Sequence, residues 1–196
     1  MPMPRGMRAC AVATVGAVLL LGACTPALIG QRPAPAAIIA PRAAFELSGR
    51  LSARHGSNAL AANFHWTHER ARDELDLSSP LGQTIARLTG DATGVRLQSS
   101  DGRIETASDW PTLTTRALGW PLPVEGLAFW IQGLPRGDAP STIEPGSDGM
   151  PAVLRQDGWV IVYQAFQRGA DGAAHPQRLT LDYPEVELRI AVDAWR

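Results

Sequence analysis

Few residues of this chain could do acid–base or metal chemistry, and they are scattered. The four histidines are His55, His65, His68 and His175. His65 and His68 are three residues apart, and on a strand that spacing sends the two rings to opposite faces. Carboxylates two residues apart, at 74 and 76 and at 185 and 187, are typical of solvated outer strand faces. Ligand count and geometry therefore predict no metal site.

The basic residues exclude several catalytic chemistries, because all 18 of them are arginine and the chain has no lysine. Without lysine there can be no P-loop lysine, no Schiff base and no Ser–Lys nucleophile pair. The sequence also lacks G-x-S-x-G, H-E-x-x-H and a glycine-rich phosphate loop. We therefore expect a protein that is not an enzyme and needs no cofactor. A formal net charge of −1 gives no indication of a nucleic-acid partner.

The first 23 residues have the pattern of a secretory signal peptide. Arg5 and Arg8 precede an apolar run over 11–21, which is too short to cross a bilayer comfortably. The run ends in L-G-A-C, which resembles the bacterial lipobox, a signal whose cysteine is acylated after cleavage. We expect 1–23 to be a lipoprotein signal peptide and Cys24 to be the lipid attachment site. The alternative is an ordinary signal followed by an incidental cysteine.

The segment after Cys24 is predicted to be a tether. Thr25 stands where enterobacterial lipoproteins carry aspartate for inner-membrane retention, so the resemblance implies the outer membrane. Residues 25–41 are rich in proline and alanine and show no period, which is typical of a linker. We expect an acylated N-terminus and linker over 24–42 and a single domain over 43–196.

The elements that must position any site are mainly strands. Apolar and polar residues alternate over 45–54, 60–67 and 74–78, and again near 179–181 and 186–193. Shorter runs follow at 85–88, 95–97 and 103–106, while 159–163 is apolar on both faces. Turn residues lie between these segments. This pattern predicts an antiparallel meander of half-buried strands.

The middle of the chain changes to a helical period. Asp109 or Ser108 can cap a helix that ends at Gly119, and a second helix is predicted from Pro123 to about residue 132. A loop is predicted over 136–150, which is rich in Gly, Pro, Asp and Ser. The fold class is therefore mainly β with a few short helices (α+β). It fits an incomplete antiparallel β-barrel, or strongly curved sheet, with a helical lid over an apolar cavity.

One turn carries an unexpected residue. In S-S-P-L-G-Q, Pro80 and Gly82 favour a tight connection, but the residue between them is Leu81. Leucine has no backbone reason to occupy a turn tip. Either Leu81 folds back to cover the end of its own sheet, or it is a deliberately exposed apolar residue.

Several motifs together resemble the LolB family, the outer-membrane lipoprotein receptors that end the lipoprotein sorting pathway of Gram-negative bacteria. The motifs are L-S-G-R-L from Leu47, F-H-W from Phe64, L-D-L-S-S-P-L-G-Q-T from Leu75, L-G-W-P-L-P-V-E-G-L-A-F-W-I-Q-G-L-P from Leu118 and G-W-V-I-V-Y from Gly158. Their order and spacing make the match specific, and it covers roughly Phe45 to Trp195. The lack of lysine departs from more lysine-rich members.

The resemblance implies a receptor for acylated proteins. Its cavity would take the acyl chains of triacylated lipoproteins from the periplasmic carrier LolA and release them into outer-membrane lipids. The protein would be a lipid-anchored monomer on the periplasmic face of the outer membrane. In the family, the apolar residue of the P-L-G turn (Leu81, between Pro80 and Gly82) is implicated in delivering cargo into the membrane.

The sequence offers candidates for the acyl-chain cavity but cannot separate cavity lining from ordinary core. They are Phe64, Trp66, Leu75, Leu77, Trp110, Leu127, Trp130 and Tyr163. Two other functions stay open on the sequence alone: an anchored periplasmic module that binds another lipid or apolar ligand, and a structural envelope lipoprotein with a filled core.

Overall fold

The structure, a computed structural model, describes residues 41–169 and 171–196. The first half of the sheet comprises β1 (Ala44–His55), β2 (Asn58–Glu69), β3 (Arg72–Ser78), β4 (Thr84–Asp91), β5 (Gly94–Ser99) and β6 (Ile104–Ala107). The second half comprises β7 (Ser141–Pro145), β8 (Pro151–Gln156), β9 (Trp159–Arg168), β10 (Ala174–Tyr183) and β11 (Val186–Trp195). Between the halves lie α1 (Trp110–Leu118) and α2 (Val124–Trp130).

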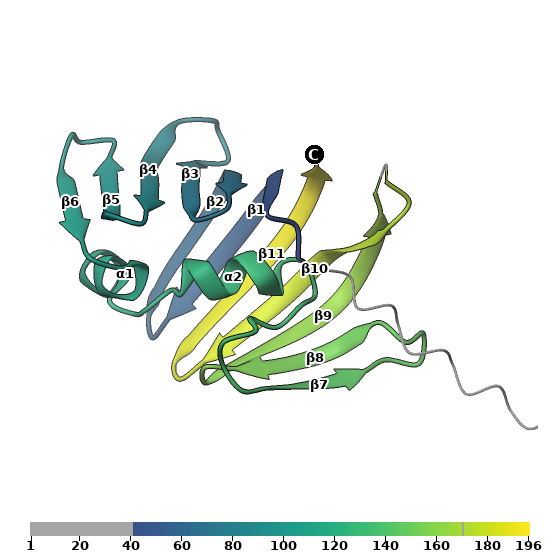
Figure 1. Cartoon of the computed structure of the whole chain (residues 1–196). Coiled ribbons are helices and arrows are strands. Elements are labelled where there is room, and N and C mark those ends of the chain that lie inside the picture. Colours follow the sequence, from purple (N-terminus) through teal and green to yellow (C-terminus); the bar gives the residue numbers. More distant parts are fainter. Residues whose placement is uncertain (1–40, 170) are drawn as a thin grey trace, which may run out of the picture. The chain divides into compact units, whose positions relative to one another are not determined.

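All eleven strands form one antiparallel sheet in the order β6-β5-β4-β3-β2-β1-β11-β10-β9-β8-β7. The first and last strands of the domain therefore pair at its centre. In the described part of the chain β6 and β7 each pair on one side only, so the sheet curves without closing (Figure 1). The predicted fold class is confirmed.

The helices carry the chain from one edge of the sheet to the other, and both lie over the same face of the curved sheet (Figure 1). The carboxylate of Asp109 caps α1 by accepting from the Thr112 amide at 2.8 Å, and Gly119 ends the helix at a φ of 87°. Pro123 precedes α2 as predicted. The short elements between 108 and 133 thus follow the sequence signals closely.

The central strand pair depends on a close backbone approach at Gly49. The register of β1 and β11 shifts between Ser48 and Gly49, and a Cβ on Gly49 would overlap with the Ala191 carbonyl oxygen. Glycine is therefore required at this position, near the middle of the sheet.

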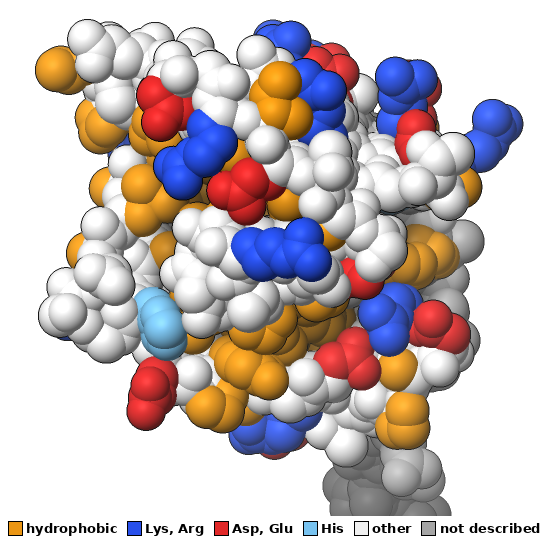
Figure 2. Space-filling view, turned by 90° about the vertical axis from the view of Figure 1, so that its left-hand side faces the viewer, with side chains coloured by type: hydrophobic (Ala, Val, Ile, Leu, Met, Phe, Trp, Pro, Cys, Tyr) orange, Lys and Arg blue, Asp and Glu red, His pale blue; other side chains and the backbone are white. Residues whose placement is uncertain are grey.

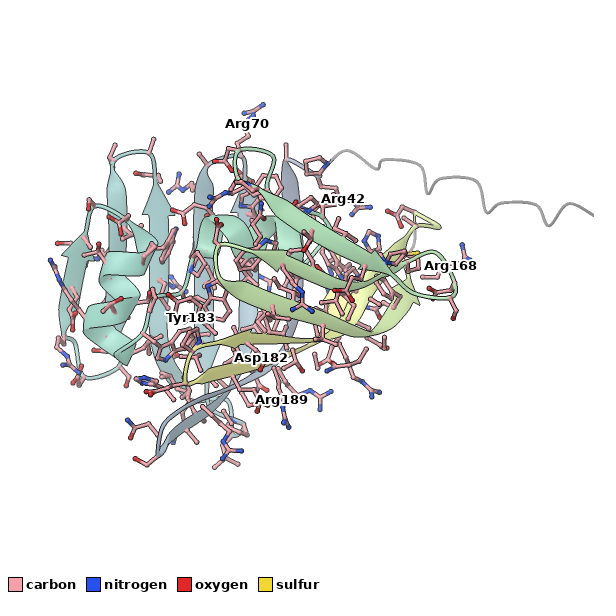
Figure 3. All side chains as sticks on the ribbon, turned by 90° about the horizontal axis from the view of Figure 1, so that it is seen from below. Arg42, Arg70, Arg168, Asp182, Tyr183 and Arg189 are labelled. Atoms are coloured by element: carbon pink, nitrogen blue, oxygen red, sulfur yellow. The ribbon has the colours of Figure 1, made fainter. Side chains whose placement is uncertain are left out.

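The inner face of the sheet is apolar and the outer face is charged. Trp66, Leu47 and Ile161 are among the inward residues that are almost fully buried. Outward residues form ion pairs in solvent, such as Arg50 with Asp193 and Arg87 with Asp76, and the heads of Arg70, Arg168 and Arg189 point away from the ribbon (Figure 3). This division is what the period of two predicted.

The predicted loop over 136–150 needs correction. It contains the edge strand β7, whose Ser141 pairs with Gln156 and whose Pro145 pairs with Pro151. Every residue of β7 is exposed, so no alternation of apolar and polar residues could reveal it. Proline is tolerated there because the strand lies at an edge.

Candidate functional site

An apolar cavity of about 130 Å³ lies between the two helices and the first half of the sheet together with β11. Its walls are side chains from β1 to β5, β11, α1, α2 and the connection between the helices. The lining residues are Leu51, Ala53, Leu60, Phe64, Trp66, Leu75, Leu77, Ile85, Ala86, Leu88, Leu97, Thr114, Ala117, Leu118, Trp120, Leu122, Val124, Leu127, Ile131, Leu188 and Ile190. Such a wall suits hydrocarbon.

Thr114 is the one polar residue among those lining this cavity, and its hydroxyl is already engaged. It donates to the Trp110 carbonyl at 2.8 Å and accepts from the Leu122 amide at 2.7 Å. The cavity therefore presents neither a charge nor a free hydrogen-bonding group to a guest. A polar ligand would be desolvated there without compensation.

The structure divides the eight predicted lining residues into two groups. Phe64, Trp66, Leu75, Leu77 and Leu127 line the cavity. They lie on β2, β3 and α2, where alternate residues of the strands and one side of the helix point inward.

The other three candidates lie outside the cavity. Trp110 is packed over Gly90 at the start of α1. The Trp130 indole donates to Gln156 Oε1 at 2.8 Å, and the Tyr163 hydroxyl donates to the Trp130 carbonyl, also at 2.8 Å. Burial raises the pKa of the Tyr163 phenol, so it remains a neutral donor. Trp130 and Tyr163 thus belong to the packed core beside β8 and β9.

Sequence reasoning did not select several lining residues, notably Trp120, Leu188 and Ile190. Leu188 and Ile190 alternate on β11, and pairing places them opposite Ala53 and Leu51 of β1. The alternation showed that they face inward. Only the pairing of the first and last strands, which are far apart in the sequence, brings them to the cavity.

The mouth of the cavity lies beside the turn that carries Leu81. Leu77 and Ile85, on the two strands that flank this turn, are lining residues that remain partly exposed, and so is Leu118 at the end of α1. Figure 2, which views the molecule from the side of β6 and α1, shows hydrophobic side chains gathered in a hollow on that face.

Leu81 itself is 90% exposed at the tip of the turn between β3 and β4. The Ser79 amide donates to the Gln83 carbonyl at 2.7 Å, and Gly82 has a φ of 84°. The turn is therefore formed by its backbone, with no contribution from the leucine side chain. Leu81 does not cover the end of its own sheet.

The cavity is small for a lipid. A 150 Å³ apolar cavity in a protein interior holds one benzene molecule. By that measure 130 Å³ holds roughly six carbons, about a third of a 16-carbon acyl chain. At this volume the cavity is too small for one whole acyl chain.

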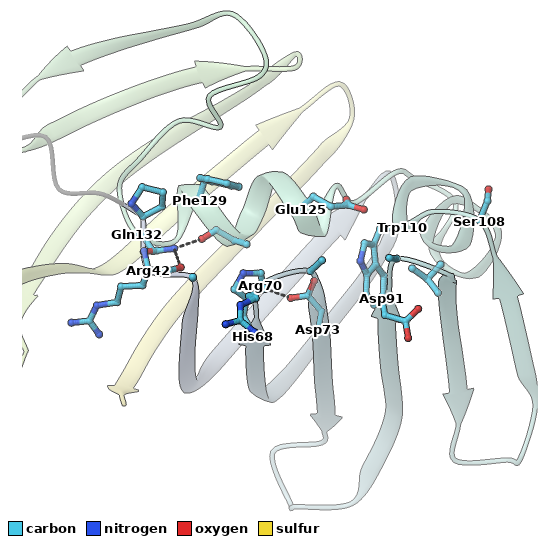
Figure 4. Close-up of a pocket in the computed structure, with 16 residues that line it drawn as sticks. Arg42, His68, Arg70, Asp73, Asp91, Ser108, Trp110, Glu125, Phe129 and Gln132 are labelled. Atoms are coloured by element: carbon cyan, nitrogen blue, oxygen red, sulfur yellow. Dashed lines mark hydrogen bonds and ion pairs between the residues drawn. The ribbon is translucent and has the colours of Figure 1, made fainter.

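A second cleft of about 620 Å³, lined by both charged and apolar residues, lies on the other side of α2 (Figure 4). In it Asp73 Oδ1 accepts from the Trp66 indole and contacts His68 Nδ1, both at 2.8 Å. Burial raises the pKa of Glu125, at the start of α2. Asp73 thus fixes the ring of Trp66, which is part of the wall of the apolar cavity.

Within 41–169 and 171–196, no three His, Cys, Asp or Glu side chains are grouped so that they could hold a metal ion. No helix in those ranges is long and apolar enough to cross a membrane. Cys24, the predicted lipid attachment site, the signal peptide over 1–23 and nearly all of the predicted linker lie outside the described residues.

Comparisons with known proteins agree on one family. A family model described as outer membrane lipoprotein LolB matches residues 43–195. The outer-membrane lipoprotein LolB of Thiobacillus denitrificans is 41% identical over 84% of this chain and 87% of its own. That of Chromobacterium violaceum is 39% identical over 92% of this chain and 94% of its own.

Solved structures with little sequence similarity share the fold. A LolA-superfamily protein from Nitrosomonas europaea has a TM-score of 0.51 at 7% identity, over 81% of this chain and 88% of its own. A DUF1329 family protein from Desulfovibrio piger has a TM-score of 0.52 at 9% identity, over 79% and 85%. At such identities the likeness concerns the fold alone.

Proposed function

This chain belongs to the LolB family of outer-membrane lipoproteins, and from that premise we propose that it accepts acylated lipoproteins from LolA and inserts them into the outer membrane without nucleotide. The observation that carries this proposal is the apolar cavity, whose lining has no charge and no free hydrogen-bonding group. The ligand class that such a wall favours is hydrocarbon.

Direct handover between two cavities explains why no energy source is needed. Moving a 16-carbon chain into water costs roughly 12 kcal/mol at about 0.8 kcal/mol per methylene. Free diffusion of a triacylated protein is therefore negligible. When the mouths of two proteins meet, the chains stay in apolar surroundings, and only the difference in affinity between the two cavities must favour transfer.

Delivery to the membrane is assigned to the turn around Leu81. Leu77 and Ile85 lie both in the cavity wall and next to this turn, so a chain leaving the mouth passes the leucine. An exposed leucine at a turn tip can enter the lipid interface and hold the mouth against it. Pro80 and Gly82 shape the turn, and Cys24 is the proposed acylated anchor of a monomer on the periplasmic face.

The decisive test is transfer of a labelled triacylated lipoprotein from purified LolA to this domain without nucleotide. The acceptor is the domain over 41–196. Native gels separate the acceptor from LolA, so the position of the label shows which protein holds the lipoprotein. We expect the label to leave LolA and co-migrate with this domain. Retention of the label on LolA at excess acceptor would refute the proposal. Binding of free phospholipid without uptake of lipoprotein would favour a general lipid-binding module instead.

A further inference from the structure

The volume of the cavity requires that a wall move, provided that the proposed function is right. About 130 Å³ holds roughly a third of one 16-carbon chain, whereas the cargo carries three chains. The sheet side of the cavity is made of paired strands, and moving them would break ladder hydrogen bonds. The wall that moves is therefore α1, α2 or their connection.

The C-terminal end of α2 is fixed to the second half of the sheet. Trp130 is fully buried, with its indole bound to Gln156 and its carbonyl bound to the Tyr163 hydroxyl. Gln156 is also buried, and its amide donates to the carbonyls of Arg136 and Ala139 at 2.8 and 3.0 Å. The Gln156 side chain thus bonds both α2 and the segment that follows it. Releasing α2 would break the whole set together.

Gln132, two residues after the end of α2, is also held by hydrogen bonds. Gln132 accepts from the Arg42 amide at 2.8 Å and donates to the Ala128 carbonyl at 2.8 Å. The segment that enters the domain therefore also holds α2 (Figure 4). An opening that began with α2 would disturb both halves of the sheet.

In contrast, α1 is firmly attached only at its N-terminal half. Trp110 and Leu113 are buried against the sheet, but Leu118 at the other end is 38% exposed. Near the C-terminal end of α1, the Arg116 guanidinium donates a solvent-exposed hydrogen bond to the Thr106 carbonyl at 3.3 Å. Thr106 lies on β6, an edge strand of four residues. Ala117 and Leu118 nevertheless form part of the cavity wall.

One partly buried hydrogen bond connects α1 to the segment that leads into the fixed helix. Thr114 Oγ1 accepts from the Leu122 amide at 2.7 Å, and the Leu122 carbonyl in turn accepts from the Val124 amide at the start of α2. The C-terminal half of α1 cannot swing away from α2 unless the connection over 119–122 extends. Extension breaks the bond to Thr114.

We infer that the cavity opens when the C-terminal half of α1 swings away from α2, and that the Thr114–Leu122 hydrogen bond is the latch that keeps it closed. Trp110 is the fixed end of this flap, and Leu118 is its free edge at the mouth. Thr114 is a positioning residue, because it controls access without offering a free polar group to the guest.

Amide hydrogen exchange in the wild-type domain tests the flap directly. The reporters are the Leu122 amide, bonded to Thr114 Oγ1 at 2.7 Å, and the Ile131 amide, bonded to the Leu127 carbonyl at 2.9 Å. We expect Leu122 to exchange by local opening and Ile131 only by global unfolding. Equal protection of the two amides, or faster exchange at Ile131, would overturn the inference.

The latch is tested by Thr114→Val, which keeps the branched shape and removes the hydroxyl, and by Thr114→Ser, which keeps the hydroxyl. A net hydrogen bond is worth a factor of roughly two to ten in the opening equilibrium. We expect Thr114→Val to raise the association rate of palmitate by that factor, with exchange at Ile131 unchanged and Thr114→Ser close to wild type. An unchanged rate in Thr114→Val would refute the latch.

The proposed function and the flap can be contradicted separately. If the wild-type domain takes up no palmitate although the Leu122 amide opens locally, the proposed function is contradicted while the flap stands. If palmitate binds but the Leu122 and Ile131 amides open together, the function stands and the flap is overturned. The exchange comparison in the wild type needs no variant, so it decides even if Thr114→Val does not fold.

Discussion

Replacing Leu81 separates delivery from binding. The side chain is 90% exposed, and a Cβ added at the neighbouring Gly82 would meet no heavy atom within 4 Å. A substitution at the tip removes no packing, so Leu81→Glu should change the free energy of unfolding by less than about 0.5 kcal/mol. The cavity lining does not include Leu81, and uptake of palmitate should therefore be unchanged.

The expected loss lies in the membrane step. Full burial of a leucine side chain in an apolar environment contributes about 2 kcal/mol, which corresponds to roughly a 30-fold change in an equilibrium constant. Leu81→Ala should lose most of this factor. Leu81→Glu should lose more, because a carboxylate at the tip resists entering the lipid interface.

The assay is transfer of a labelled lipoprotein from the loaded receptor into vesicles of phosphatidylethanolamine and phosphatidylglycerol, separated by flotation. Ile143→Glu is the matched control, because Ile143 is 45% exposed on β7 at the opposite edge of the sheet. We expect insertion to fall at least about 30-fold in Leu81→Glu and to be normal in Ile143→Glu. Normal insertion by Leu81→Glu, or equal losses in both variants, would refute the role given to the turn.

Three further predictions concern the cavity, the sheet and α2. Ala86→Phe places a ring in the 130 Å³ cavity, and a ring of this size fills a 150 Å³ cavity. Palmitate uptake should therefore be abolished while circular dichroism shows a folded domain. Undiminished uptake would show that the chain binds elsewhere. Gly49→Ala should cost at least about 2 kcal/mol in urea unfolding, because its Cβ would overlap with the Ala191 carbonyl, and a wild-type midpoint would contradict the close approach. The pKa of Glu125 is raised in the fold, so the unfolded chain releases this proton first, and stability falls as pH rises above the unfolded pKa. Glu125→Gln should therefore be the more stable form at pH 7 with the difference gone near pH 3, and a difference that grows on acidification would reverse this assignment.

Local signals were sufficient to predict most of the fold. The period of two predicted the strands on either side of the helices, and Asp109, Gly119 and Pro123 marked the helix ends. These features depend on residues close together in the chain. Neither β7 nor β8 was predicted; β7 shows no alternation because all its residues are exposed, and it is a strand only through its pairing with β8.

The site was predictable only in part, since periodicity tells which residues face inward but not what they meet there. Trp66 and Trp130 are both inward and aromatic, yet one lines the cavity and the other is packed in the core. The difference lies in what each ring faces: Trp66 faces the two helices from β2, whereas Trp130 faces β8, where Gln156 bonds its indole from 26 residues further along the chain. Thr114 gave no signal, because its role depends on the amide of Leu122.

Photo-crosslinking of the bound acyl chain tests the central claim most directly. A lipoprotein with a diazirine near the end of one acyl chain is passed from LolA to the wild-type domain, irradiated and mapped by mass spectrometry. We predict adducts on cavity residues, with Leu75, Leu88 and Ile190 as the deep positions. Adducts confined to the outer face of the sheet or to the second cleft, beside Glu125, would contradict the account.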